Sequence, residues 1–337
     1  MTRIFTLVYC LIAGTAAADP ASIDAARREG SVVWYSTLIV NQIVRPMAAA
    51  FEAKYPGIKV EYSRSSSSDV SLKIANESRA HKVRADVFDG SNTVFLLRDP
   101  RLVETYRPNA AEAWPAELRD PEGKWTALNL FYWTAAYNTN QVKAEDAPKT
   151  FTDLLNPKWK GKIAWTYDLT PGGPPGFVHN ILSTMGEQQG TDYLRALAKQ
   201  EPVTIPGAQR VVLDQVISGE YPLCAMILNY HAAISQKAGA PVAWIKMEPL
   251  LQTFGLVSIV ANGPHPNAAK LFVEFMLSEE GQTVLANNDY IPAHPGVQAR
   301  IPELKPDRGG FAVNLVTPAM VRDDSPGWTK IYKELFQ

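Results

Sequence analysis

The residues of this chain that could do chemistry gather in polar loops that follow short apolar runs. Hydroxyl groups and free backbone N–H groups at the start of a helix can receive an anion, helped by the helix dipole. Serine and aspartate also favour the N-cap position, so residues 65–69 are equally consistent with a simple helix cap. The candidate ligand-binding residues in these loops are Ser36, Thr37, Ser66, Ser67, Ser68, Asp89, Gly90 and Ser91.

A second group of candidates lies further along the chain. The loop 170–176 is rich in glycine, which allows close backbone approach to a ligand, but its three prolines also suit a rigid connector. Tyr230 and His231 could coordinate a metal, hydrogen-bond a ligand or fill an interface, and one tyrosine with one histidine is too few for a metal site. Trp133 could line a cleft, although tryptophans in strands more often lie in the core. The candidates of this group are Trp133, Thr170, Gly172, Gly173, Tyr230 and His231.

Local signatures of catalysis are missing. The sequence has no Gly-x-Ser-x-Gly elbow, no His-Glu-x-x-His motif, no P-loop and no Gly-x-Gly-x-x-Gly motif. The five histidines are scattered without ligand spacing. We therefore expect no catalytic residues, no metal cofactor and no enzymatic activity.

The elements that must position these loops alternate along the chain. Short apolar runs at 31–35, 58–62 and 85–88 are typical of strands, and the segments 44–55 and 69–79 between them have helical spacing. This order predicts a parallel α/β sheet. Ligands of such sheets bind at the loops after the carboxyl ends of the strands, which is where residues 36–37, 64–65 and 89–90 fall.

Length and composition limit the class of protein. With 337 residues we expect about two domains. The 46% hydrophobic content and the net charge of −1 exclude a disordered chain and argue against nucleic acid as a partner. The two cysteines cannot build a disulfide framework.

The first 18 residues are typical of a secretory signal peptide. One arginine precedes an apolar run of about ten residues and a small-residue stretch that ends at Ala18. We expect cleavage near Ala18, which removes Cys10 and leaves Cys224 as a buried free thiol. The mature protein would then be exported to the periplasm, without a membrane span.

Several segments together resemble a known family. The strongest is the region from Phe254, with Gly255-Leu-Val-Ser-Ile-Val-Ala-Asn-Gly263, the stretch His265–Gln282 and Ile291-Pro292. Weaker segments precede it in the chain and stand in the same order as in the family: Trp34–Thr37, Phe51–Val60, Ala85–Phe88, Ala136–Asn138, Leu155–Ile163 and Ser218–Leu223. Together they resemble periplasmic solute-binding proteins of ABC importers, and the branch they are most similar to is the ferric-ion-binding type.

The resemblance implies a type 2 periplasmic-binding fold: two Rossmann-like α/β lobes joined by two crossing strands, with a solute trapped between them by hinge closure. We place the crossings at 128–137 and 251–260. After the signal peptide 1–18, lobe 1 would comprise 19–133 and 254–300, and lobe 2 would comprise 134–253 and 301–337. An ABC permease in the inner membrane is the implied partner, and we expect a monomer.

The ligand is where this chain departs from the ferric binders. Those proteins usually present two adjacent tyrosines where this chain has Tyr230-His231, and often a further ligand where it has Thr37-Leu38. Imidazole in place of phenolate weakens a site for hard Fe³⁺. We therefore predict a small organic or oxyanionic solute, with Asp89 either selecting a cationic or zwitterionic one or facing away. The alternatives are ferric iron as the transported ligand, held by Tyr230 and His231, and a secreted hydrolase.

Overall fold

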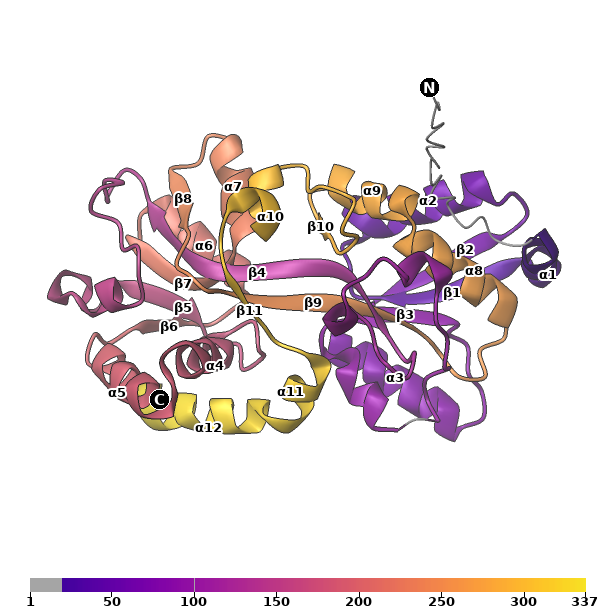
Figure 1. The fold of residues 1–337 in the computed structure, drawn as a ribbon, viewed down its shortest axis with the longest axis horizontal. Helices are drawn as coiled ribbons and strands as arrows, with labels where there is room; N and C mark the ends of the chain where they lie inside the picture. Colours follow the sequence, from indigo (N-terminus) through magenta and orange to yellow (C-terminus); the bar gives the residue numbers. More distant parts are fainter. Residues whose placement is uncertain (1–19, 100) are drawn as a thin grey trace, which may run out of the picture.

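The strands of the chain join in one sheet that runs through two α/β lobes (Figure 1). The computed structural model describes residues 20–99 and 101–337, so the predicted signal peptide and Cys10 lie outside the described residues. The strands are β1 (Ser31–Ser36), β2 (Lys59–Arg64), β3 (Val87–Gly90), β4 (Thr126–Asn138), β5 (Ile163–Thr166), β6 (Val203–Ile205), β7 (Leu223–Leu228), β8 (Val242–Ile245), β9 (Leu250–Ile259), β10 (Ile291–Pro292) and β11 (Val313–Leu315).

Lobe 1 is built on the parallel strands β2, β1 and β3. Apolar side chains of β1, such as Val32 and Trp34, are fully buried, and Trp34 meets Phe272 edge to face with ring centroids 5.3 Å apart. The helices that cover this lobe are α1 (Pro20–Glu29), α2 (Arg45–Lys54), α3 (Ser67–Arg79), α8 (Pro266–Leu277) and α9 (Glu279–Asn287). The C-terminal ends of its strands point toward the second lobe.

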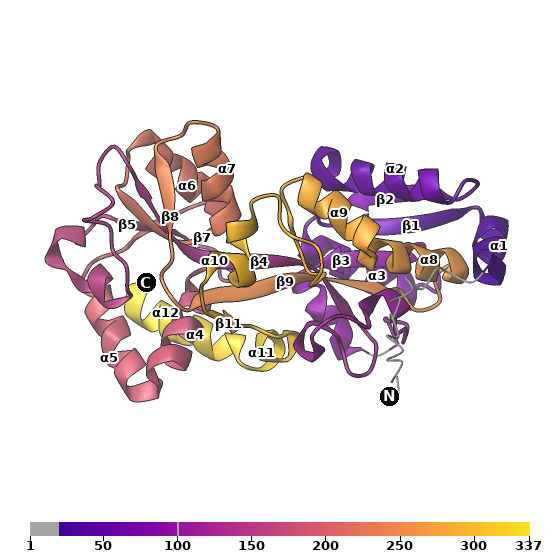
Figure 2. The same ribbon diagram turned by 45° about the horizontal axis from the view of Figure 1, so that its top comes forward.

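Two long antiparallel strands, β4 and β9, connect the lobes (Figures 1 and 2). All ten residues of β9 are buried, and most of them are apolar; Gln252, Thr253 and Ser258 are the polar ones. The pairing of β4 shifts at Ala127/Asn129 and again at Thr134/Ala136, so the crossing part of β4 has an irregularity near each end. The predicted crossing segments coincide with these two strands to within a few residues.

Lobe 2 carries the parallel strands β7, β5 and β6, with β8 beside β4. Its core gathers around Trp165, Phe177 and Tyr332. The helices of this lobe are α4 (Pro174–Met185), α5 (Glu187–Ala198), α6 (Gln209–Ser218), α7 (Asn229–Lys237) and α12 (Ser325–Phe336). The prediction of two α/β lobes joined by two crossing strands is confirmed.

The C-terminal segment runs along both lobes. It contains α10 (Pro306–Gly309), strand β11, which pairs with β9, and α11 (Pro318–Asp323). Arg98, at the end of a 3₁₀ helix in lobe 1, donates to the backbone oxygen of Arg322 at 3.3 Å, whereas α12 packs against α4. Because this segment contacts both lobes, the lobe boundaries given above stay a prediction.

None of the helices in the described part of the chain combines the length and the apolar character that a membrane span requires.

Candidate ligand-binding site

Asp89 organises the loop that follows β1. The Trp34 indole Nε1 donates to its Oδ2 at 2.7 Å, and Thr37 donates to its Oδ1 from the backbone N at 2.9 Å and from Oγ1 at 2.7 Å. Burial raises the pKa of Asp89, although the hydrogen bonds from Ser36, Thr37 and Trp34 act in the opposite direction. The carboxylate is only 1% exposed and its donors all come from lobe 1, so it is directed into that lobe.

Ser36 is the last residue of β1 and Gly90 is the last residue of β3, so both are strand residues. The Ser36 side chain is fully buried, and its Oγ accepts a hydrogen bond from the Leu38 N–H at 3.1 Å. Gly90 has a φ of 140°, a backbone conformation that glycine adopts far more readily than other residues. Ser91 follows it and is exposed.

The serine-rich start of α3 is a capped helix end. Ser66 is the N-cap, and its Oγ accepts from the Asp69 N–H at 3.2 Å while donating to the Asp69 carboxylate at 2.7 Å. Asp69 thus places a negative charge in the first turn, where it interacts favourably with the helix dipole. Ser67 and Ser68 begin the same helix.

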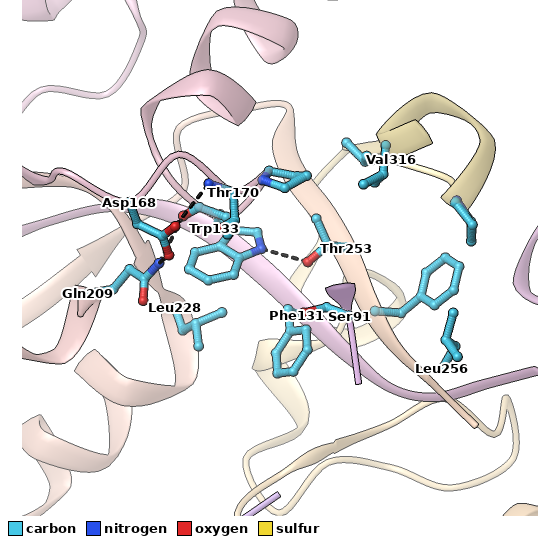
Figure 3. A pocket seen from close by; sticks show the side chains of 15 residues that line it. Ser91, Phe131, Trp133, Asp168, Thr170, Gln209, Leu228, Thr253, Leu256 and Val316 are labelled. Atoms are coloured by element: carbon cyan, nitrogen blue, oxygen red, sulfur yellow. Dashed lines mark hydrogen bonds between the residues drawn. The ribbon is translucent and has the colours of Figure 1, made fainter. Parts of the chain in front are cut away.

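A cavity of about 240 Å³ lies between the lobes, beside the crossing strands (Figure 3). Four predicted site residues line it: Ser91 from lobe 1, Trp133 from β4, and Thr170 and Gly172 from the loop before α4. The other predicted residues are not among its lining residues. The full lining set is Ser91, Phe131, Trp133, Asp168, Thr170, Pro171, Gly172, Gln209, Leu228, Thr253, Phe254, Leu256, Val316, Pro318 and Val321.

Trp133 occupies the middle of this cavity wall. It is half-buried, packs against the cores of both lobes, and donates from Nε1 to Thr253 Oγ1 at 2.8 Å (Figure 3). A Cβ atom at Gly172 would overlap its ring, so the loop backbone lies directly against the indole. Gly173 is the N-cap of α4, and a Cβ there would overlap the backbone oxygen of Asp168.

Asp168 and Gln209 form a polar cluster that the sequence analysis did not predict. Asp168 Oδ1 accepts from the Thr170 N–H at 2.9 Å, and its Oδ2 accepts from Gln209 Nε2 at 3.0 Å (Figure 3). Asp168 stands two residues beyond the end of β5, and Gln209 begins α6 just after β6. Their positions after strand ends were a usable signal, because ligands of α/β sheets gather there.

Tyr230 and His231 open α7, next to the cavity residue Leu228 but not in the lining. The Tyr230 ring lies 4.4 Å from the His231 ring and 6.1 Å from the Tyr290 ring, measured between centroids. Burial raises the pKa of Tyr230 well above its ordinary value, with a further contribution from Tyr290. Burial and the Arg210 guanidinium lower the pKa of His231 to about 4, so the imidazole is neutral at pH 7.

Within residues 20–99 and 101–337, no group of three or more His, Cys, Asp or Glu side chains is placed to hold a metal ion. Which of the predicted site residues touch the ligand stays a prediction.

The fold agrees with comparisons to known proteins. A family model described as "Bacterial extracellular solute-binding protein" matches residues 85–308. The chain belongs to this family. It is a solute-binding protein, as the sequence resemblance implied.

Relatives of this family member cover most of its length. The major ferric iron-binding protein of Neisseria meningitidis serogroup B is 26% identical over 297 residues, which are 82% of this chain and 83% of that protein. The structure of iron-bound HitA from Pseudomonas aeruginosa is 22% identical with a TM-score of 0.73, over 91% of this chain and 99% of that one. The structure of AfuA from Actinobacillus pleuropneumoniae, with exogenous fructose-6-phosphate bound, is 22% identical with a TM-score of 0.71, over 91% and 98%. At these identities, the likeness of the two solved structures to this chain is a likeness of fold.

Proposed function

We propose that this protein is a periplasmic receptor that captures a small organic solute between its two lobes and delivers it to an ABC permease. The observation that carries the proposal is the lining of the interlobe cavity. It combines the aromatic rings of Phe131, Trp133 and Phe254 with the hydroxyl groups of Ser91, Thr170 and Thr253. Apolar walls with a few polar groups are typical of pockets for organic ligands.

The same lining favours an organic solute over a simple oxyanion. Within the described part of the chain, no lysine, arginine or histidine lines the cavity to neutralise an anion. The serine-rich start of α3 already carries the carboxylate of Asp69 in its first turn, which would repel an oxyanion.

Capture would proceed by closure about β4 and β9. A solute stabilises the closed form to the extent that it contacts both lobes there and only one in the open form. Ser91 on lobe 1 and Thr170 on lobe 2 line the same cavity, so both lobes have groups to offer. Export by the predicted signal peptide and action as a monomer belong to the same proposal.

Catalysis is not part of this proposal, although Ser31, His265 and Asp86 form a Ser–His–Asp arrangement. Ser31 Oγ lies 3.3 Å from His265 Nε2, and His265 Nδ1 lies 2.8 Å from Asp86 Oδ2. Asp86 also accepts from the backbone N–H groups of Val33 and His265, both at 2.7 Å. Ser31 stands at the opposite end of β1 from the cleft, and none of the three side chains lines the cavity. These bonds tie α8 to the sheet.

Ferric iron is the second candidate ligand. The names of several relatives support it, and so does the position of Tyr230 beside His231 and Tyr290. Iron would need the Tyr230 phenolate, whereas burial favours the neutral phenol. For this reason we rank ferric iron second to an organic solute as the proposed ligand.

A thermal-shift and fluorescence titration tests the proposal. The protein is titrated with polyols, sugars, amines, organic acids and ferric citrate. We expect one organic solute to stabilise the fold, by about 2.7 kcal/mol at 100 times its Kd, and to change the tryptophan emission. In Trp133→Phe most of that change should disappear, because Trp133 lines the cavity.

Ferric citrate separates the two candidates. If only ferric citrate stabilises the protein, and its phenolate-to-iron absorption band is absent in Tyr230→Phe, the organic proposal is wrong and iron is the ligand.

A further inference from the structure

The interlobe cavity carries a negative charge that its own walls do not neutralise. Among the described residues that line it, Asp168 is the one with a charged side chain. The two arginines that follow lining residues are each paired with an acid of their own. Arg210, after Gln209, lies 2.7 Å from Asp214, and Arg322, after Val321, lies 2.6 Å from Asp323.

The hydrogen-bonding groups around Asp168 are mainly acceptors. A carboxylate can accept about four hydrogen bonds, and Asp168 accepts one from Thr170 and one from Gln209. The Gln209 side-chain nitrogen donates to Asp168 and, at 3.5 Å, to the backbone oxygen of Gly172. The side-chain oxygen of Gln209 is therefore the group that can face a solute, and it can only accept. A solute bound here should therefore bring the donors.

The aromatic groups fit the same kind of solute. The Trp133 indole lies next to Asp168 and Gln209 in the cavity wall, and Phe131 lies 6.3 Å from it between ring centroids (Figure 3). Indole rings attract cations through their electron-rich faces, by about 0.5 to 2 kcal/mol depending on desolvation. A carboxylate beside an indole recognises a cationic nitrogen by charge and by ring contact at once.

We infer that the solute carries a cationic nitrogen, as an organic amine or quaternary ammonium group, and that Asp168 and Trp133 recognise it. This inference rests on the proposed function, since it names the class of solute for the same cleft. In this inference Asp168, and not Asp89 as the sequence suggested, selects the charge of the solute. The Asp89 carboxylate already accepts hydrogen bonds from donors of its own lobe.

Pairs of probes that differ in charge but not in shape test the inference by calorimetry and thermal shift. Choline is compared with 3,3-dimethylbutan-1-ol, and putrescine with butane-1,4-diol; glucose, citrate and inorganic phosphate represent neutral and anionic solutes. We expect at least one cation to bind with a Kd about tenfold or more below that of its neutral partner, which corresponds to about 1.4 kcal/mol.

Two variants locate the effect. Asp168→Asn keeps an oxygen for the Thr170 N–H and should abolish the preference for the cation. Asp192→Asn is the matched control, because Asp192 is an exposed acid of lobe 2 on α5 that pairs with Arg195. This variant should keep the preference, and the melting temperatures of both variants without solute verify that they fold.

The outcomes separate this inference from the proposed function. If neutral or anionic probes bind and the cations do not, or if Asp168→Asn leaves the Kd of the cation unchanged, the inference is wrong and the receptor proposal stands. If no organic probe binds at all, both are wrong.

Discussion

At the scale of single residues, the direction of a side chain decides its role. Asp89 and Asp168 each lie near the C-terminal end of a strand, one in each lobe: Asp89 within β3, and Asp168 two residues beyond β5. Asp89 is buried and accepts three hydrogen bonds of 2.7 to 2.9 Å from Trp34 and Thr37. Asp168 is half-buried and lines the cavity. Two similar positions in the sequence thus have a structural role in lobe 1 and a proposed binding role in lobe 2.

Asp89→Asn should destabilise the protein. The amide oxygen can still accept from Thr37, but the amide nitrogen then faces the Trp34 N–H, which leaves buried donors without an acceptor. We expect a loss of about 1 to 3 kcal/mol in the free energy of unfolding, measured by urea denaturation. The exposed control Asp192→Asn should change it by less than about 0.5 kcal/mol. An unchanged stability together with a large loss of solute affinity would instead show that Asp89 contacts the solute.

At the scale of elements, the loop before α4 and the strand β4 build the cavity wall together. The loop can approach the indole of Trp133 only because Gly172 has no side chain. The glycine-rich sequence was ambiguous between a ligand cradle and a connector, and the structure shows close backbone approach to a tryptophan that lines the cleft. The prolines at 174 and 175 then start α4 directly behind it.

Gly172→Ala should displace Trp133 and weaken binding. The new methyl group overlaps the ring, so the side chain or the loop must move, at a cost of about 1 to 3 kcal/mol in stability. We expect a shifted tryptophan emission without solute and a Kd raised by about tenfold or more. Gly327→Ala is the control, because a Cβ there, in the first turn of α12, meets nothing within 4 Å. Equal effects of the two substitutions would contradict the close packing at Gly172.

At the scale of the whole molecule, the lobes are joined by strands and by the C-terminal segment. The register shifts of β4 at Ala127/Asn129 and Thr134/Ala136 bracket its crossing part, and we expect bending on closure to concentrate there. The C-terminal segment must follow this motion, because α11 contacts lobe 1 and α12 packs on lobe 2.

Closure can be measured with spin labels on the two lobes. Leu72 on α3 and Val211 on α6 are 58% and 42% exposed, and both can be replaced by cysteine. Cys224 should stay unlabelled, because burial raises the pKa of its thiol to about 12. We expect the label-to-label distance to shorten when the solute identified by thermal shift is added. A pair within lobe 2, Lys199→Cys with Val211→Cys, should not change, and a cross-lobe distance that stays constant would rule out hinge closure.

Much of the fold could be predicted from the sequence. Apolar runs of strand length alternate with helical spacing, and together with the family segments they indicated two α/β lobes and both crossing strands. These features are local, because the periodicity of a segment reports which of its faces is buried. The sequence also showed that the loops after strand ends were the region to search for a ligand.

The composition of the cleft was decided by the tertiary structure. Trp133, Asp168, Gln209 and Thr253 come from four separated segments, and only the pairing of β4 with β9 and β7 brings them to one cavity. The sequence by itself determined the family, the two lobes and the places where a solute could bind. The direction of each polar side chain depends on strand register and on partners distant in the chain, such as Trp34 for Asp89, and a linear sequence does not display these partners.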